Sequence, residues 1–378
     1  MAAERPRGMG GTAQVHRRRI AGMNPERKKR WKETVAALSR SLRFPSVFLG
    51  LRHPFCGSMQ TVMLVYHRVV PQQTLNEVCS LPQIVTPLDH FEAQLDYLAD
   101  QYHILSMSEF EKARQERRAL PLKTAVITFD DGWEDNYTHA FPALKRRGIP
   151  AAIFLSTAYI ETGRFFWQEY MVYLIQVWRQ RLQSGEITVT ETQQLPPMLK
   201  TALLSSHGER EVLRLIESLK GEDDNVRAPL LGVLSEKLQS PPYPIHTNGF
   251  LNWNQVRIMH AAGIEFGSHA QTHRLMPSLS RDELVREVRE SKKQIEAMLG
   301  GPVTTFAYPN GNYNTAVMAE LKAAGYQLAA TTRRGINTAR TNPYELCRIN
   351  VNGALFTGSD GRFSSDLFAF KLSGLRQA

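Results

Sequence analysis

The chain has 378 residues, enough for one large domain or two ordinary ones, and its 42% hydrophobic and 22% charged residues are typical of a soluble globular protein. No apolar run is long enough to span a membrane, and three scattered cysteines without a C-x-x-C pair argue against a disulfide framework or a cysteine zinc site. Of the net charge of +10, residues 1–30 carry +7, from nine Arg or Lys and two Glu. We therefore expect no specific nucleic-acid partner.

Residues 1–55 are predicted to form an N-terminal segment of their own. Residues 1–30 lack periodicity and indicate a disordered basic arm, whose true start could also be Met23. A helix follows, with apolar residues on one face at Trp31, Val35, Leu38 and Leu42. This helix either lies on an anionic membrane surface or packs on the following domain. Because no apolar h-region follows the basic residues, we expect a cytoplasmic protein. If the helix lies on a membrane, it would contact the inner membrane face.

From residue 60 onward, short apolar runs alternate with helical patterns. The runs predicted as strands are VMLVYH (62–67), TAVITF (124–129), AAIFLS (151–156), IEFGSH (264–269), VTTFAY (303–308) and QLAATT (327–332). A capping box, Ser280 with Glu283, begins one of the intervening helices. Repeated β-then-α units favour an α/β fold with parallel strands, either a (β/α) barrel or an open doubly wound sheet.

The alternation stops near residue 160 and resumes near residue 250. We interpret residues 161–249 as a largely helical insertion within a domain that covers residues 56–378. The aromatic residues of RFFWQEYMVYLIQVW (164–178) suggest that one side of the insertion packs on the barrel.

Polar residues stand where four of the predicted strands end. These clusters are Tyr66–His67, Asp130–Asp131–Gly132, Ser268–His269 and Tyr308–Pro309. Catalytic residues of parallel barrels come from the carboxyl ends of several strands. The coincidence of four clusters is therefore more informative than any one motif.

Asp130 and Asp131 are adjacent carboxylates directly after a buried strand. Burying two like charges is costly unless something compensates them, and a divalent cation would bind one and keep the other ionised as a base. An isolated Asp-Asp-Gly is, however, also ordinary turn chemistry.

His269 and His273 form an H-x-x-x-H pattern that can share one ion, although isolated pairs are often surface or core histidines. With Asp131 they would leave coordination positions open for water and substrate, as catalytic zinc requires. His67 ends a different strand. It is either a core histidine or, opposite the base, a general acid, since its ordinary pKa is about 6.5.

At these residues the sequence resembles the polysaccharide deacetylases of carbohydrate esterase family 4, the NodB-homology group. TFDDG (128–132), GSHAQTH (267–273) and FAYPNG (306–311) are similar to the first, second and third family motifs, in the same order. The likeness covers about residues 60–350. It implies a distorted, seven-stranded (β/α) barrel, interrupted here by the helical insertion.

The resemblance also implies roles. Asp130 would be the general base, and Asp131, His269 and His273 would hold a divalent metal, usually Zn²⁺. Tyr308, Pro309 and Asn310 would form the substrate and oxyanion region. The implied activity is metal-dependent removal of N-acetyl groups from N-acetylglucosamine-type units of a glycan.

The sequence departs from the family pattern at three places. Ala270 replaces the Ser or Thr of the second motif, and Ala307 replaces an Arg that orients the base, for which Arg348 is a candidate substitute. No histidine follows His273, so the usual late acid histidine is missing. VYHRV (65–69) resembles the early histidine motif of permuted members that act on poly-N-acetylglucosamine, which implies that His67 is the acid.

Three alternatives remain open from the sequence. The same residues would serve an O-deacetylase acting on an acetylated glycan. Ala270 and Ala307 would suit a non-catalytic glycan-binding member of the fold. The basic arm would bind nucleic acid nonspecifically if it carried the main function.

Overall fold

The structure is a computed structural model, and it describes residues 60–205 and 208–373. The predicted basic arm and amphipathic helix of residues 1–55 lie outside the described residues. The expected membrane contact and cytoplasmic location therefore stay predictions. Among the described helices, none combines the length and the apolar character that a bilayer crossing needs.

The described chain forms two compact units, one within residues 57–354 and the other including residues 355–373. In the smaller unit, α16 (Ser365–Leu372) begins where the Ser364 side chain accepts a hydrogen bond from the Leu367 N–H. The Phe368 ring meets the rings of Phe356 and Phe363 edge-on. The candidate site lies in the larger unit.

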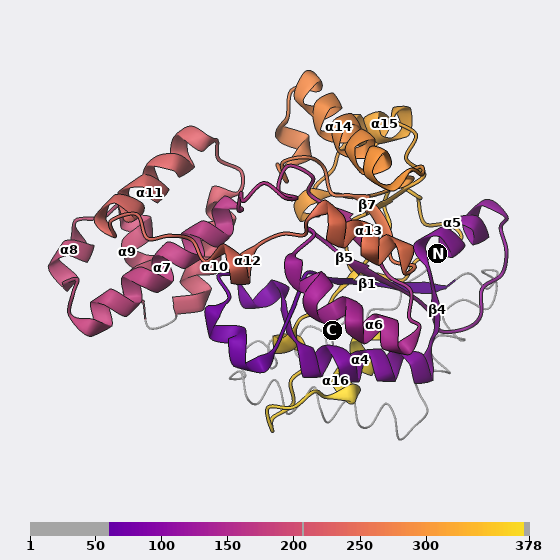
Figure 1. Ribbon diagram of the computed structural model, residues 1–378, viewed down its shortest axis with the longest axis horizontal. Coiled ribbons are helices and arrows are strands. Elements are labelled where there is room, and N and C mark those ends of the chain that lie inside the picture. Colours follow the sequence, from indigo (N-terminus) through magenta and orange to yellow (C-terminus); the bar gives the residue numbers. More distant parts are fainter. Residues whose placement is uncertain (1–59, 206–207, 374–378) are drawn as a thin grey trace, which may run out of the picture. The chain divides into compact units, whose positions relative to one another are not determined.

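A curled sheet of parallel strands forms the centre of the larger unit (Figure 1). Its main path runs β10-β1-β5-β6-β7-β8-β9, and β4 pairs with β5 beside this path. The strands are β1 (Thr61–Tyr66), β4 (His103–Leu105), β5 (Thr124–Phe129), β6 (Ala152–Leu155), β7 (Glu265–Ser268), β8 (Thr305–Ala307), β9 (Leu328–Ala330) and β10 (Ile349–Asn350). A bridge between Ala330 and Leu346 joins β9 to the segment that leads into β10. The predicted distorted barrel with a seven-strand path is confirmed.

Pairing register places the ends of the central strands side by side. All six residues of β1 are buried and pair in parallel with β5, from Thr61 opposite Thr124 to Tyr66 opposite Phe129. The chain therefore leaves both strands at the same edge. A separate two-stranded sheet, β2 (Arg68–Val70) with β3 (Val85–Pro87), follows β1.

Helices connect the strands as the alternating pattern predicts. They are α4 (Leu88–Gln101), α5 (Met107–Gln115), α6 (Phe141–Arg147), α13 (Trp253–Ala261), α14 (Arg281–Leu299) and α15 (Thr315–Ala323). The predicted capping box is present, because Ser280 and Glu283 each accept a hydrogen bond from the other's backbone N–H at the start of α14. Helix α14 ends at Gly300, whose φ of 72° is the left-handed conformation common after a helix.

Between β6 and α13 the chain forms the helical insertion, which gathers beside the sheet (Figure 1). Its helices are α7 (Trp167–Ser184), α8 (Val189–Gln193), α9 (Pro197–Leu204), α10 (Gly208–Leu219), α11 (Asp224–Lys237) and α12 (Ile245–Asn248). The insertion has its own hydrophobic core, which includes Ile175, Trp178, Leu215 and Leu234. It can therefore hold side chains in fixed positions against the barrel.

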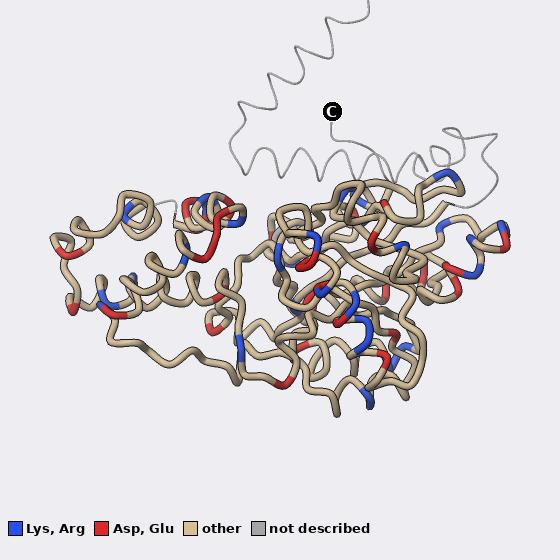
Figure 2. The backbone as a smooth tube through the Cα atoms, turned by 90° about the horizontal axis from the view of Figure 1, so that it is seen from above, with Lys and Arg blue, Asp and Glu red and all other residues tan. Residues whose placement is uncertain are grey.

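Lys and Arg residues are interspersed with Asp and Glu residues over the described chain, as Figure 2 shows. The concentrated positive charge of the sequence lies in residues 1–30, outside the described residues.

Gly267, in β7, provides a test of how tightly the barrel interior is packed. A Cβ atom at this position would lie 2.6 Å from Cδ1 of Phe154 and 2.6 Å from Oγ1 of Thr305. We expect Gly267→Ala to lower the free energy of unfolding by about 1–3 kcal/mol through overpacking. Urea unfolding with a metal chelator present measures this change. Gly301→Ala, where a Cβ would meet no heavy atom within 4 Å, is the matched control. Equal effects of the two substitutions would contradict the packing argument.

Candidate metal centre

Three side chains from two strand ends converge at the carboxyl edge of the sheet. Asp131, His269 and His273 each offer a ligand atom, and these atoms lie within 4.8 Å of one another. Oδ1 of Asp131 is 3.5 Å from Nε2 of His269 and 3.3 Å from Nε2 of His273. One carboxylate with two imidazoles is a donor set that suits a catalytic divalent metal.

The environment of Asp131 fits a cation. Its Oδ2 accepts a 2.9 Å hydrogen bond from the buried Trp133 indole N–H, whereas Oδ1 is buried and accepts none from the described residues. Burial and the neighbouring Asp130 charge raise the pKa of Asp131 well above its usual value. A cation at Oδ1 would compensate this charge. The triad is therefore consistent with a divalent metal of the kind typical of this donor set.

The two histidines are held so that the Nε2 atom of each faces Asp131. Nδ1 of His269 lies 2.8 Å from the Ala307 carbonyl oxygen. Because a carbonyl can only accept, Nδ1 must carry the proton, which leaves the Nε2 lone pair free for a cation. The His273 ring stacks on Phe166, with ring centroids 4.5 Å apart. Burial lowers the pKa of both imidazoles, so both are neutral and able to bind a metal near pH 7.

The loop between the histidines is braced despite Ala270. The Ala270 N–H donates to Oγ of Ser268, 3.1 Å away, and Glu287 of α14 accepts from the N–H groups of Gln271 and Thr272. Glu287 also accepts from the Thr272 hydroxyl. These contacts brace the loop around position 270 without a side-chain hydroxyl there.

Backbone strain is concentrated at the site. Of the nine non-glycine residues with positive φ in the described chain, four belong to the motifs: Asp131, Ala270, His273 and Asn310. Such conformations each cost of order 1–3 kcal/mol and persist only where the surroundings impose them. The strained backbone conformations thus occur within the segments that carry the triad and the third motif.

Asp130 forms a buried ion pair with Arg348. Nη1 and Nη2 of Arg348 donate to Oδ1 and Oδ2 of Asp130, each over 2.7 Å, and both side chains are buried. Arg348 also donates to the Thr331 carbonyl. Burial, the largest single effect, raises the pKa of Asp130, but the charge and hydrogen bonds of Arg348 together with His269 and His67 outweigh it and lower the pKa below the usual range. The structure thus places Arg348 against Asp130. That Arg348 replaces the arginine missing at position 307 stays a prediction.

His67 lies at the end of β1 and lines the same cavity as Asp130 and the triad. Its side chain is half-buried, and its Nδ1 accepts no hydrogen bond from the described residues. The Asn136 side chain anchors its carbonyl oxygen. Burial lowers the pKa of His67 to about 4, although the charge of Asp130 acts in the opposite direction.

The third-motif residues Tyr308, Pro309 and Asn310 differ in their exposure to solvent. Tyr308 and Pro309 are buried, and the Tyr308 hydroxyl donates to the Tyr344 carbonyl, 2.9 Å away. Asn310 is exposed and accepts a 2.6 Å hydrogen bond from Lys220, which follows α10 of the insertion. Asn310 therefore reaches the cavity, whereas the Tyr308 side chain supports its wall. The predicted substrate roles of these residues stay predictions.

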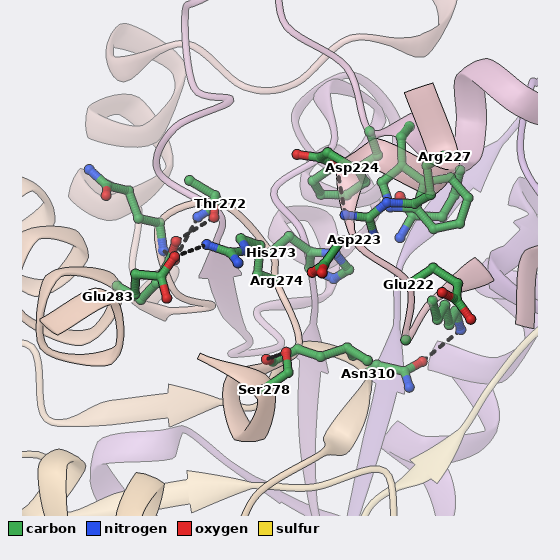
Figure 3. A pocket seen from close by; sticks show the side chains of 18 of the residues that line it. Glu222, Asp223, Asp224, Arg227, Thr272, His273, Arg274, Ser278, Glu283 and Asn310 are labelled. Atoms are coloured by element: carbon green, nitrogen blue, oxygen red, sulfur yellow. Dashed lines mark hydrogen bonds and ion pairs between the residues drawn. The ribbon is translucent and has the colours of Figure 1, made fainter. Parts of the chain in front are cut away.

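A cavity and an adjoining cleft surround the triad. The cavity, of about 330 Å³, contains the triad, Asp130 and His67. The cleft, of about 440 Å³, lies between residues 220–227 of the insertion and residues 271–287 of the barrel (Figure 3). Five residues line both spaces: Phe166, Gln168, Lys220, His273 and Asn310. A substrate larger than one small group can therefore extend from the triad into the cleft.

Sequence reasoning missed several residues of this site. Trp133, Phe166 and Glu287 contact the triad or its loop, and Glu169 lines the cavity from α7. Glu169 is buried, and burial raises its pKa to about 7. Only the position of Trp133, two residues after Asp131, offers a local signal.

The family model described as polysaccharide deacetylase matches residues 117–207 and 223–329, more than half of the chain. The chain belongs to the polysaccharide deacetylase family, the hydrolases of carbohydrate esterase family 4. The match includes all three residues of the triad, whereas His67 and Arg348 lie outside the matched residues. An acetylated polysaccharide substrate is implied by this membership.

Two named proteins are similar in sequence. YxkH of Bacillus subtilis, named for the same family, is 21% identical over 302 residues, which are 80% of this chain and 75% of that protein. The poly-beta-1,6-N-acetyl-D-glucosamine N-deacetylase of Staphylococcus epidermidis is 24% identical over 243 residues, 59% of this chain and 76% of that protein.

Two solved structures share the fold. The deacetylase PplD of Streptococcus pyogenes, in complex with acetate, is 20% identical with a TM-score of 0.51, and covers 79% of this chain and 95% of its own. IcaB of Ammonifex degensii is 19% identical with a TM-score of 0.51, and covers 84% of this chain and 97% of its own. At these identities the likeness concerns the fold.

The Asp130–Arg348 pair generates a stability prediction. Arg348→Met leaves a buried carboxylate without its partner, so we expect it to lower the free energy of unfolding by about 3–5 kcal/mol near pH 7. Because the folded pKa of Asp130 is lowered, the pair stabilises the native state above about pH 4, the usual pKa, and loses this contribution as the pH falls further. In the variant burial raises the Asp130 pKa instead, so the loss should shrink on acidification.

Urea unfolding of the metal-free protein near pH 7 and near pH 5 measures this effect. The double variant with Asp130→Asn and Arg348→Met removes both charges and should recover part of the loss. A double variant no more stable than Arg348→Met alone would show that the ion pair is not the cause.

Proposed function

We propose that the protein is a zinc-dependent deacetylase that removes N-acetyl groups from N-acetylglucosamine units of a polysaccharide. One observation carries this proposal: Asp131, His269 and His273 converge in a cavity that Asp130 and His67 also line. The similarity to a poly-beta-1,6-N-acetyl-D-glucosamine N-deacetylase supports the choice of substrate.

Asp131, His269 and His273 would hold the metal through one oxygen and two Nε2 atoms. Zinc is favoured over magnesium or calcium because two of the three donors are imidazole nitrogens. When bound, the ion supplies a Lewis acid that acidifies water and polarises the acetyl carbonyl.

Asp130 would accept the proton of the attacking water. The Arg348 guanidinium keeps its carboxylate ionised and fixes both of its oxygens, so Asp130 is always available as an acceptor. The same pairing makes it a weak base, which suits an acidified water and not bulk water. Arg348 is thus a positioning residue for Asp130.

His67 would donate the proton that the leaving nitrogen needs when the C–N bond breaks. With a pKa of about 4 its imidazole is neutral near pH 7, so it must take up a proton during the turnover before it can donate one. Its place in the cavity with Asp130 allows that transfer within the site. The products are acetate and a free amino sugar. The backbone N–H of Asn310 would stabilise the negative charge that develops on the acetyl oxygen.

The proposal predicts metal-dependent acetate release. We expect the purified protein to bind about one zinc per chain, as measured by elemental analysis, and to release acetate from N-acetylglucosamine oligomers. His273→Ala should lose both the zinc and the turnover, because a ligand is missing. Asp130→Asn should keep the zinc while turnover falls by about 10²-fold or more.

A zinc-loaded protein that released no acetate from any N-acetylated glycan would refute N-deacetylation. Release from O-acetylated glycans alone would assign O-deacetylation instead. His260→Ala, a histidine of α13 outside the cavity, serves as the matched control and should retain both zinc and activity.

His67 is tested through the leaving group. His67→Gln should lower kcat on the N-acetylated oligomer by about 10²–10⁴-fold with little change in KM, because amine departure requires a proton. Hydrolysis of 4-nitrophenyl acetate should be almost unchanged, because nitrophenolate departs without one. Initial rates on both substrates measure the difference. A similar loss on the ester would mean that His67 does not act as the acid.

A further inference from the structure

The first turn of α7 brings two polar side chains to the triad that the proposed chemistry does not use. Gln168 and Glu169 are the second and third residues of this helix, and both line the cavity. Gln168 also lines the adjoining cleft. They come from the insertion, whereas the triad, Asp130 and His67 come from the barrel.

Glu169 is buried, and one of its two carboxyl oxygens has no hydrogen-bond partner among the described residues. Its side chain is 6% exposed, and among the described residues none donates a hydrogen bond to its Oε2. The guanidinium that most affects it, Arg68, is already bound to Asp135, Ser80 and Asn248. Burying a carboxyl oxygen that accepts no hydrogen bond is costly, so its retention needs a reason other than stability.

The surrounding cavity suggests what would satisfy this carboxyl. Oε1 of Gln168 is also buried and accepts no hydrogen bond from the described residues. Both side chains thus present oxygen acceptors to one space. A second metal ligand is not indicated, because the cluster of ligand atoms within 4.8 Å of one another consists of Asp131, His269 and His273. The missing partners are hydrogen-bond donors, and a sugar ring supplies several as hydroxyl groups.

We propose that Glu169, assisted by Gln168, is a specificity-determining residue that accepts hydrogen bonds from the hydroxyl groups of the sugar ring that carries the acetamido group. The identity of this ligand rests on the proposed function. The barrel then supplies the hydrolytic groups, and the insertion supplies recognition of the sugar. A site built to accept hydroxyl hydrogen bonds discriminates strongly against ligands that lack them, because its own polar atoms would stay unpaired.

A purely structural role for Glu169 has a different signature. A carboxylate in the first turn of a helix can stabilise the exposed N–H groups there. If that were its function, removing the charge would lower the thermal stability and would leave sugar binding as strong as in the parent protein.

The test is equilibrium binding of N-acetylglucosamine tetramers, linked β-1,6 or β-1,4, to the zinc-loaded full chain by titration calorimetry. All binding measurements are made with Asp130→Asn also present, because this substitution should keep the zinc and slow hydrolysis of the tetramers. We expect Glu169→Ala to raise Kd by about 30-fold and Glu169→Gln by about 5- to 10-fold, because the amide keeps one acceptor but loses the charge. Zinc content should not change. The thermal midpoint of Glu169→Gln without sugar should equal or exceed that of the parent protein.

Glu186→Gln is the matched control, since Glu186 is an exposed carboxylate just after α7 that lies 3.9 Å from Arg181 and accepts a hydrogen bond from the Ser184 hydroxyl. It should bind both tetramers as the parent does. Unchanged Kd in both Glu169 variants, or a parent protein that binds neither tetramer, would overturn the inference. So would a loss of zinc in Glu169→Gln.

Failure of the proposed function gives a different result. Binding that depends on Glu169 without any acetate release would leave sugar recognition standing and refute the deacetylase. If Glu169→Ala released acetate with unchanged kcat and KM, the deacetylase would stand and sugar recognition by Glu169 would be refuted.

Discussion

Two adjacent carboxylates buried at the end of β5 are the constraint on which the site depends. Asp130 and Asp131 would repel each other in a dry environment, so each needs its own compensation. Asp130 receives it from Arg348, which forms a bidentate pair across the barrel interior. Asp131 receives one hydrogen bond from Trp133 and faces two neutral imidazoles. A cation beside Asp131 would compensate the charge that remains there.

The strands, the helical insertion and the clustering of motif residues were predictable because their signals are local. Apolar runs predict the strands, and polar residues directly after them predict a shared edge, since parallel strands end together. The contacts that brace the site were not predictable in the same way. Glu287 lies 16 residues beyond Gln271, and Arg348 lies 218 residues beyond Asp130. No periodicity joins such partners, and only the curled sheet with its packed helices brings them together.

At Ala270 and Ala307 the chain lacks the polar side chains of the family motifs, and residues from other parts of the chain make the corresponding contacts. The loop between His269 and His273 needs hydrogen bonds because its backbone is strained, and Ser268 and Glu287 provide them. The buried Asp130 carboxylate needs a positively charged partner, and the Arg348 guanidinium supplies it from the segment before β10. A non-catalytic descendant would have no reason to keep a buried ion pair, because such pairs contribute little to stability compared with apolar residues.

The insertion supplies part of the wall of the cavity and the cleft. Its helices share a core of their own, so α7 and the end of α10 can present Glu169 and Lys220 at fixed positions. Lys220 reaches Asn310 of the third motif, and Phe166 stacks on His273, so the insertion contacts residues on both sides of the triad. Reaction chemistry and sugar recognition would then reside in different parts of the chain. A barrel of this family could thus keep its hydrolytic groups while its substrate range changes through the inserted helices alone.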